Sequence, residues 1–339
     1  MTVKPPALAA GDTIGIVAPS WCGPARYPGR VERGAKFLRS QGYEVIVAPH
    51  AYGKDDYVSG TPEERVADIH QMFADESVRA IVAAIGGAHS CHLLPLLDWS
   101  LIGRHPKIFM GFSDISVLNL AIHRRTGLIT FNGPMIMSEF AEDPSPLAYT
   151  LDYAWRALCR SMPVGEIVPA AEWTDDFLYW ATDAELTNPR PLRPSPGWTW
   201  LRAGIAEGPL IGGCIESIEH LRGTGYWPEM QGAILFLETS EEKPSLATVD
   251  AMLQDYDNMG VFGQIAGLLF GRSMGYHESQ RAGLRSLLLE RTRNYGFPIV
   301  SDMDFGHIGP QVTLPIGCTA CIDSAKGRVA ITEAAVAAR

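Results

Sequence analysis

The chain has 339 residues, of which 46% are hydrophobic and 19% charged, which suits a packed core and excludes a disordered or collagen-like chain. At this length two domains of roughly 150 residues each are expected. The formal net charge of −10 is not offset by any run of Lys or Arg, which argues against a DNA- or RNA-binding protein.

The sequence predicts a cytoplasmic location. No stretch approaches the roughly 18 consecutive apolar residues of a membrane-spanning helix, and the first six residues lack the apolar run of a signal peptide. The six cysteines are scattered along the chain, unlike the framework of a secreted disulfide-rich protein. We therefore expect reduced thiols and no contact with a membrane.

The first half of the chain alternates apolar strands with helices. Strands are expected at 13–18, 43–48, 79–85 and 107–111, and helices at 31–38, after residue 61 and at 114–125. Thr61 to Glu64 forms a capping box with a proline at the first helical position. Because strands that are apolar on both faces are typical of a parallel sheet covered by helices, we predict an α/β domain over residues 1–165.

Residues 166–205 have a different character. Trp173, Trp180, Trp198 and Trp200 stand among prolines without a clear period, which indicates a linker or lid. From residue 206 to 339 the alternation resumes, and a smaller α+β domain is expected there. Its strands are expected at 232–237, 265–270, 312–314, 320–323 and 329–331, and its helices at 248–257 and 277–293.

Ser113 is a candidate nucleophile. It lies between the apolar strand that ends near residue 111 and the helix that begins at Asp114. A tight strand-to-helix turn exposes a hydroxyl and directs helix N–H groups towards it, which can stabilise an oxyanion. The alternative is that Ser113 is only a helix N-cap, and position alone favours that reading. Ile115 also replaces the second glycine of the G-x-S-x-G elbow, which weakens an assignment to the α/β hydrolases.

A serine nucleophile needs a base and a group that orients the base. His307 stands between glycines that allow close backbone approach, although an exposed turn histidine would show the same pattern. Glu238 closes a predicted strand, where a carboxylate projects into the crevice used by open α/β sheets. Glu241 and Glu242 follow in what we expect to be a solvated turn.

No metal or cofactor is predicted. His89 and His92 lack a nearby carboxylate, which favours positions on a helix surface over ligand roles. Cys318 and Cys321 form a single C-x-x-C without a second pair of ligands. The chain contains neither a Walker A motif nor a dinucleotide-binding fingerprint.

Several short segments spread over nearly the whole chain form a further pattern: 17–20, 84–87, 111–114, 210–214, 235–242, 306–307 and 314–317. Taken together and in this order, they resemble the LD-carboxypeptidase family of serine peptidases, and within it the branch of microcin C immunity peptidases. The resemblance implies a Ser-Glu-His triad, which matches Ser113, Glu238 and His307. These are the three residues reached above from their chemistry.

The resemblance also implies an oxyanion hole and a fold. The oxyanion donors would be the backbone N–H groups of Asp114, Gly86 and Gly87. The fold would join an N-terminal flavodoxin-like domain to a C-terminal domain built around a small β-barrel. Members of the family act in the cytoplasm without a metal, commonly as homodimers.

The two branches differ in substrate. LD-carboxypeptidases remove the terminal D-alanine of murein tetrapeptides, whereas the immunity peptidases cut the amide-type bond between an aspartyl group and a nucleotide. The segment 238–245, the long tryptophan-rich insert and the segment 223–228 resemble the immunity branch. We therefore expect a hydrolase acting between an acidic aminoacyl group and a nucleotide, with a murein carboxypeptidase as the alternative and a non-catalytic small-molecule binder as the alternative of another class.

The tryptophans offer a further expectation for a nucleotide substrate, because a purine stacks on an indole. Trp173 or Trp180 is the candidate for this contact. Trp198 and Trp200 are expected to pack the insert onto the body of the protein. The alternative is that all four tryptophans only pin an irregular segment.

Overall fold

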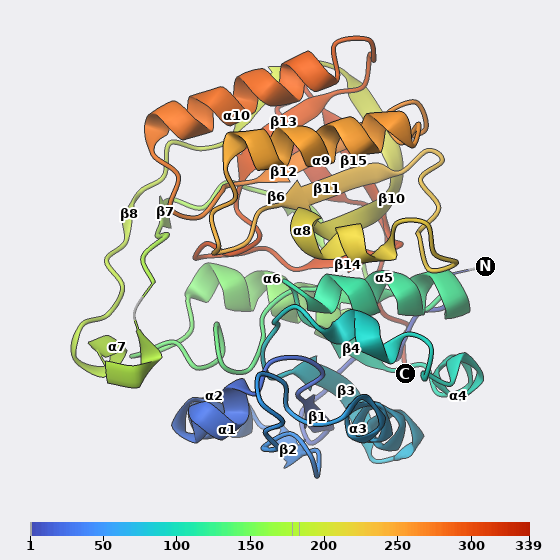
Figure 1. The fold of residues 1–339 in the computed structure, drawn as a ribbon, viewed down its shortest axis with the longest axis vertical. Coiled ribbons are helices and arrows are strands. Elements are labelled where there is room, and N and C mark those ends of the chain that lie inside the picture. Colours follow the sequence, from blue (N-terminus) through green and yellow to red (C-terminus); the bar gives the residue numbers. More distant parts are fainter. Residues whose placement is uncertain (1, 178, 183) are drawn as a thin grey trace.

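Two β-sheets organise the fold, one in each half of the molecule (Figure 1). The computed structural model describes residues 2–177, 179–182 and 184–339. The first sheet runs in the order β14 (Leu314–Ile316), β5 (Thr130–Asn132), β4 (Ile108–Met110), β3 (Val78–Ala83), β1 (Thr13–Val17) and β2 (Glu44–Val47). The second runs in the order β6 (Gly165–Ile167), β16 (Arg328–Ile331), β15 (Thr319–Asp323), β10 (Ile205–Cys214), β11 (Ile234–Glu238), β12 (Gly267–Gly271), β13 (Ile299–Met303) and β9 (Thr199–Arg202).

The first sheet is the predicted parallel sheet covered by helices. Strands β2, β1, β3, β4 and β5 pair in parallel. Its helical segments are α1 (Gly23–Arg26), α2 (Pro28–Ser40), α3 (Pro62–Ala74), η1 (Ser90–Leu93), α4 (Trp99–Arg104) and α5 (Ile115–Thr126). The capping box is confirmed, because the Thr61 side chain accepts from the Glu64 N–H and Glu64 accepts from the Thr61 N–H at 2.9 Å.

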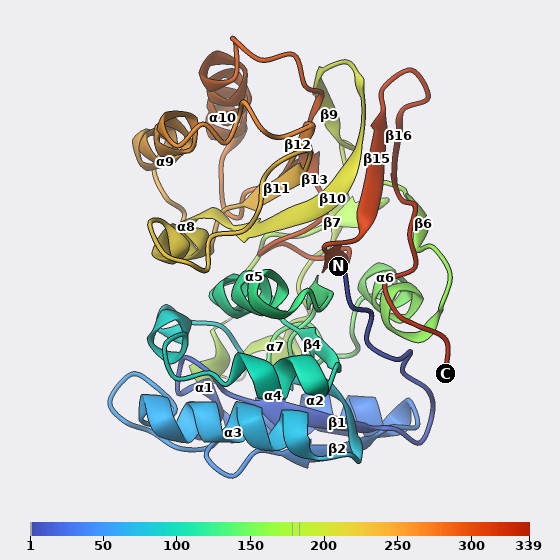
Figure 2. The same cartoon turned by 90° about the vertical axis from the view of Figure 1, so that its right-hand side faces the viewer.

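The second half combines parallel and antiparallel pairing. Strands β10, β11, β12 and β13 are parallel, whereas β15, β16, β6 and β9 add antiparallel flanks. Helices α9 (Leu246–Asn258) and α10 (Glu278–Arg291) lie side by side on one face of this sheet, with α8 (Ile215–Ile218) and η3 (Glu219–Leu221) nearby (Figure 2). The predicted fold class, an α/β domain followed by a second α+β unit, is confirmed.

Three strands cross the predicted boundaries. Strand β14 belongs by position to the second half but pairs with β5 of the first sheet. Strand β6, which follows α6 (Ala148–Cys159), pairs with β16 of the second sheet. Strand β9 lies inside the expected linker but forms an edge of the second sheet against β13. Local pattern identifies a strand but does not say which sheet supplies its hydrogen-bonding partner.

The remainder of the tryptophan-rich insert extends from the body. It contains a short hairpin of β7 (Glu172–Trp173) and β8 (Arg193–Pro194), and between them η2 (Trp180–Thr182) and α7 (Ala184–Thr187). Figure 1 shows this segment as a long extended loop that runs along one side of both halves, with α7 at the lower left beside the helices of the first half. Within the described residues, no helix is long and apolar enough to cross a membrane.

Candidate active site

A cavity of about 690 Å³ lies where strand ends of the two sheets meet. Its walls come from the loops after β1 to β5 of the first sheet, from the loops after β10, β11, β12 and β13 of the second sheet, and from the insert. The carboxyl ends of parallel strands are the usual place for ligands in open α/β sheets. Ser113 and His307 both line this cavity.

Ser113 sits in the tight turn between β4 and α5. Its φ is +60°, a left-handed conformation that costs a non-glycine residue about 1–3 kcal/mol and persists where the surroundings impose it. The side chain is mostly buried at 8% exposure. Helix α5 begins at Ile115 with Asp114 at the N-cap position, so Ser113 is not the N-cap that position alone had favoured.

Asp114 ties the loop after β3 to the start of α5. Its buried carboxylate accepts hydrogen bonds from the backbone N–H groups of His89 and Ser90, at 3.0 and 2.9 Å, and from the Ser90 hydroxyl at 2.7 Å. This anchoring holds the Gly86–Gly87 turn beside the serine. Both glycines line the cavity, and Gly87 has φ +147°.

Glu238 and His307 form a buried pair. The carboxylate of Glu238 lies at the end of β11 with no exposed surface, and its Oε2 is 2.8 Å from Nδ1 of His307. Gly306 has φ +95°, and a Cβ there would come within 2.5 Å of that same oxygen. The ring of Phe112 packs against the imidazole at 4.9 Å between centroids. The glycine before His307 thus permits the approach to Glu238.

Glu241 occupies the other side of the imidazole, where the sequence indicated only a solvated turn. Its Oε2 is 2.9 Å from Nε2 of His307, although its side chain is 47% exposed. Within the described residues Nε2 has no hydrogen bond of good geometry, so this contact is an ion pair rather than a directed hydrogen bond. Glu241 does lie in an exposed turn, as expected, but the loop after β11 folds back so that its carboxylate also contacts the histidine.

The two carboxylates decide the ionisation of the histidine. Burial lowers the pKa of His307, but Glu238 and Glu241 outweigh burial and raise it well above its ordinary value. Burial acts to raise the pKa of Glu241, and the imidazolium outweighs this and lowers it to about 2. Burial also raises the pKa of Glu238, although His307 opposes it. His307 is accordingly held as a cation between two acidic groups.

Two residues near the end of β10, Cys214 and Glu216, lie at the site without having been predicted from the sequence. Cys214 has its Sγ within 4.8 Å of ligand atoms of Glu238 and His307, the single group of three potential metal ligands in the described part of the chain. Burial and nearby carboxylates raise the pKa of the Cys214 thiol well above its usual range. Glu216 accepts from the N–H and hydroxyl of Ser240 at 2.9 and 2.7 Å. The strand-end rule that singled out Glu238 would also have found this position after β10.

The histidine and cysteine pairs weighed as metal ligands from the sequence are not part of the Cys214 group. His89 lines the cavity and stacks near Tyr57, and its ring is 5.3 Å from that of His92. Cys318 is buried, and Cys321 lies in β15.

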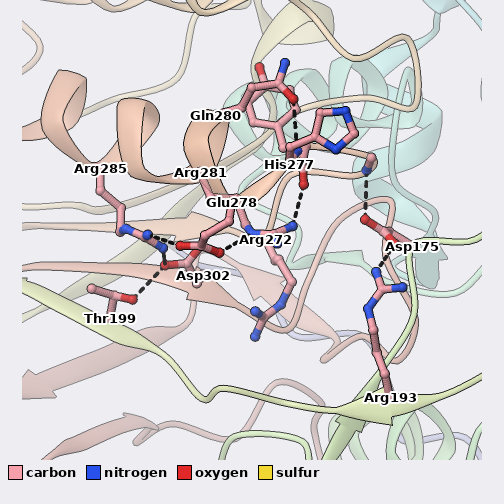
Figure 3. Close-up of polar contacts among 12 residues, drawn as sticks. Asp175, Arg193, Thr199, Arg272, His277, Glu278, Gln280, Arg281, Arg285 and Asp302 are labelled. Atoms are coloured by element: carbon pink, nitrogen blue, oxygen red, sulfur yellow. Dashed lines mark hydrogen bonds and ion pairs between the residues drawn. The ribbon is translucent and has the colours of Figure 1, made fainter.

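Of the two candidate stacking tryptophans, Trp180 lines the cavity and Trp173 does not. Trp173 is only 3% exposed, and the guanidinium groups of Arg193 and Arg272 lie 4.1 and 4.5 Å from its ring centroid. Figure 3 shows Arg193 directed to Asp175, which also accepts a hydrogen bond from the backbone N–H of Gly275 at 3.1 Å. Trp173 therefore anchors the insert rather than facing a ligand.

Trp180 stands in an aromatic wall. Its ring is 6.3 Å from that of Trp21 and 5.8 Å from that of Tyr27, and the Arg30 guanidinium lies over it at 4.2 Å. Trp198 and Trp200 pack against the main core as expected, and the indole N–H of Trp198 donates to Asp304 at 2.8 Å.

Comparison with known proteins identifies the family. Sequence models of the LD-carboxypeptidase N-terminal and C-terminal domains match residues 14–133 and 207–322. The chain belongs to the LD-carboxypeptidase family. Membership of this family implies a serine peptidase of the carboxypeptidase type.

Relatives within the family carry two kinds of name. Putative carboxypeptidase YocD from Bacillus subtilis is 34% identical over 94% of this chain and 96% of its own length. The probable murein peptide carboxypeptidase of the same organism is 31% identical over 99% and 96%. The microcin C7 self-immunity protein MccF of Escherichia coli is 30% identical over 96% and 94%.

Solved structures of the family superpose closely. MccF in complex with aspartyl sulfamoyl adenosine matches with a TM-score of 0.92 and 29% identity, covering 99% of this chain and all of that one. An MccF-like protein from Streptococcus pneumoniae in complex with AMP matches with a TM-score of 0.86 and 30% identity, covering 94% and 98%.

Proposed function

We propose that this LD-carboxypeptidase family member is a cytoplasmic serine hydrolase that cleaves the amide-type bond between an aminoacyl group and a nucleotide, working as a homodimer without a metal. The observation that carries the proposal is the cavity that joins Ser113 and the Glu238–His307 pair to the aromatic wall around Trp180. Relatives named for complexes with aspartyl sulfamoyl adenosine and AMP support a nucleotide substrate.

We assign the catalytic roles from the chemistry of a Ser-Glu-His triad. Ser113 Oγ attacks the acyl carbon, and its proton passes to Nε2 of His307. Glu238 holds the Nδ1 proton, which fixes the tautomer and stabilises the imidazolium. His307 then protonates the leaving nitrogen, and water attacks the acyl-enzyme by the same route in reverse.

The oxyanion formed in each step needs donors close to Ser113. The backbone N–H groups of Asp114, Gly86 and Gly87 are our candidates. Their support is the anchoring of the loop by the Asp114 carboxylate and the close packing of Gly86 on the serine.

The charge of the cavity argues against the acidic acyl group that the sequence indicated. In the part of the chain that the structure describes, seven carboxylates and two guanidinium groups line it: Glu139, Glu142, Asp143, Asp176, Glu216, Glu241 and Glu242, with Arg30 and Arg190. Arg190 is already paired with Glu142 at 2.7 Å. A carboxylate on the acyl group would meet repulsion, so the proposal keeps the aminoacyl group and drops its acidic side chain.

The two alternatives differ in support. A murein tetrapeptide carboxypeptidase would use the same catalytic groups, and the 31% identical Bacillus subtilis relative carries that name. A non-catalytic binder is disfavoured, because it would have no use for a buried Glu238–His307 pair beside a strained serine.

The test compares wild-type protein, Ser113→Ala and Ser138→Ala on alanyl and aspartyl sulfamoyl adenosine and on a murein tetrapeptide, with products identified by mass spectrometry. Ser138 also lines the cavity but has no part in the proposed catalytic steps, so it serves as the matched control. Wild type and Ser138→Ala should release the nucleoside, and Ser113→Ala should lose on the order of 10⁴-fold in rate. Turnover by Ser113→Ala within tenfold of wild type would refute the triad, and cleavage of the tetrapeptide alone would favour the murein alternative.

A further inference from the structure

The contact between Glu241 and His307 conflicts with the role of that histidine as a base. Nε2 is the nitrogen that must accept the proton of Ser113, yet Glu241 Oε2 lies 2.9 Å from it. His307 is nine-tenths buried, and its Nε2 has no well-directed hydrogen bond within the described residues. The two carboxylates thus favour the protonated form of the base. Its reactive nitrogen faces the Glu241 carboxylate, which is not aligned for a hydrogen bond.

The groups around the imidazole explain why it stays protonated. Glu238 at the end of β11 faces Nδ1, Glu241 in the next loop faces Nε2, and Cys214 at the end of β10 lies beside both. Phe112, in the loop after β4, contacts the imidazole through its uncharged ring and brings no titratable group. The side chain of Lys243 extends to Gly275 and does not line the cavity.

If Glu241 moves away from the histidine, its carboxylate loses the cation that now offsets its charge. Glu216 and Glu242 still line the same cavity and add negative charge to it. The lining arginines are committed elsewhere, since Arg190 pairs with Glu142 and Arg30 donates to the Met137 carbonyl at 2.6 Å and lies over Trp180. A cation carried by the ligand would therefore be the replacement partner for Glu241.

We propose that Glu241 is a substrate-binding residue that recognises an ammonium group on the acyl part of the substrate and thereby releases His307 for catalysis. The inference rests on the proposed function and defines its substrate class as acyl groups with a free amino group. The α-ammonium of an aminoacyl group and the ammonium of a basic side chain share this chemistry.

The exchange balances in charge and protons. The substrate ammonium replaces the imidazolium as partner of Glu241, and His307 gives its Nε2 proton to solvent. The histidine keeps its Nδ1 proton on Glu238 and becomes the neutral base that Ser113 needs. A neutral acyl group offers no such exchange and leaves Glu241 on the histidine.

A binding experiment tests the exchange without turnover. Ser113→Ala protein with ¹⁵N-labelled histidine is titrated by NMR alone and with alanyl, 6-aminohexanoyl or propionyl sulfamoyl adenosine, and affinity is measured by calorimetry. The first ligand carries an α-ammonium, the second only a side-chain ammonium, and the third neither. The pKa of His307 should fall with one or both ammonium ligands and remain unchanged with the propionyl ligand.

Two further variants make the result specific. Adding Glu241→Gln should lower the pKa of His307 before any ligand is present, and the ammonium ligands should then cause no further fall. Adding Glu242→Gln should preserve the fall that the ammonium ligands cause. The inference is overturned if the propionyl ligand lowers the pKa of His307 as much as the ammonium ligands do. It is also overturned if neither ammonium ligand lowers this pKa or binds more tightly than the propionyl ligand.

Hydrolysis by protein with Ser113 intact separates this inference from the proposed function. An ammonium substrate should be cleaved with a kcat/KM about 10- to 100-fold above that of the propionyl compound, as for a charge-assisted hydrogen bond, and Glu241→Gln should abolish the difference. Equal cleavage of all three substrates overturns the inference and leaves the hydrolase function intact. A fall in the pKa of His307 without cleavage supports the contact at Glu241 and refutes the hydrolase function.

Discussion

Gly86 packs against Ser113 so closely that no side chain fits between them. A Cβ at position 86 would lie 2.8 Å from Cβ of the serine, 3.0 Å from its Oγ and 3.3 Å from the backbone nitrogen of Asp114. These distances are below normal van der Waals contact, and two of the three involve atoms that cannot rotate away. The absence of a side chain at Gly86 therefore lets the loop backbone approach the proposed nucleophile.

Gly86→Ala is expected to reduce kcat/KM by at least roughly 10²-fold, as does the loss of one oxyanion donor, and to destabilise the protein by about 1–3 kcal/mol through overpacking. Gly29→Ala is the matched control, because Gly29 lies exposed in α2 with nothing near its Cβ position. That control should keep full activity and gain up to about 1 kcal/mol in stability. Wild-type activity in Gly86→Ala would show that the loop is not close to the reacting atoms.

The pH dependence of activity should reflect the carboxylates around His307. Their effect raises the pKa of His307 well above its ordinary value of about 6.5, so kcat/KM should fall with decreasing pH along a limb that lies above pH 6.5. Glu241→Gln should move this limb to lower pH, because one of the two stabilising carboxylates is gone. Identical limbs in the two proteins, measured from pH 5 to 10, would contradict the ion pair.

Stability should depend on the same pair within a defined pH window. The raised pKa of His307 contributes stability that is present below about pH 6.5 and is lost as pH rises through the folded value. The pKa of Glu241, lowered to about 2, contributes stability that is present above about pH 4.5 and is lost as pH falls towards 2. Glu241→Gln should therefore lower Tm most between about pH 4.5 and 6.5 and least well above the folded pKa of His307. A difference in Tm that is constant from pH 4 to 10 would argue against this linkage.

Replacing Trp180 and Trp173 should affect different properties, namely turnover of the nucleotide substrate at Trp180 and stability at Trp173. Trp180→Ala is expected to lose about 5- to 150-fold in kcat/KM on alanyl sulfamoyl adenosine, from a stacking contribution of roughly 1–3 kcal/mol, and little on an alanyl amide that lacks the base. Trp173→Ala should instead lose about 3–5 kcal/mol of stability, because its ring is buried between arginines. Equal losses by Trp180→Ala on both substrates would indicate a structural role and favour a peptide substrate.

Much of the architecture could be predicted because its signals are local. The capping box before α3 and the apolar strands β3 and β4 depend on neighbours within a few residues, and such patterns survive in the folded chain. Ser113 and Glu238 were found by one geometric rule, since each follows or ends a strand whose carboxyl end faces a ligand cavity. His307 was singled out by the glycines on either side of it, and the resemblance over several short segments indicated the same residue.

The alternation of strands and helices, the family and the three residues proposed for catalysis can be read from the sequence alone. The folded structure was needed to see that β14 completes the first sheet, that Trp173 is buried while Trp180 lines the cavity, and that Glu241 contacts His307. Strand propensity and turn chemistry act over a few residues, whereas a contact between loops 66 positions apart depends on how the second sheet brings the ends of β11 and β13 together. The charge state of a histidine depends in turn on the burial and the carboxylates that this packing places around it.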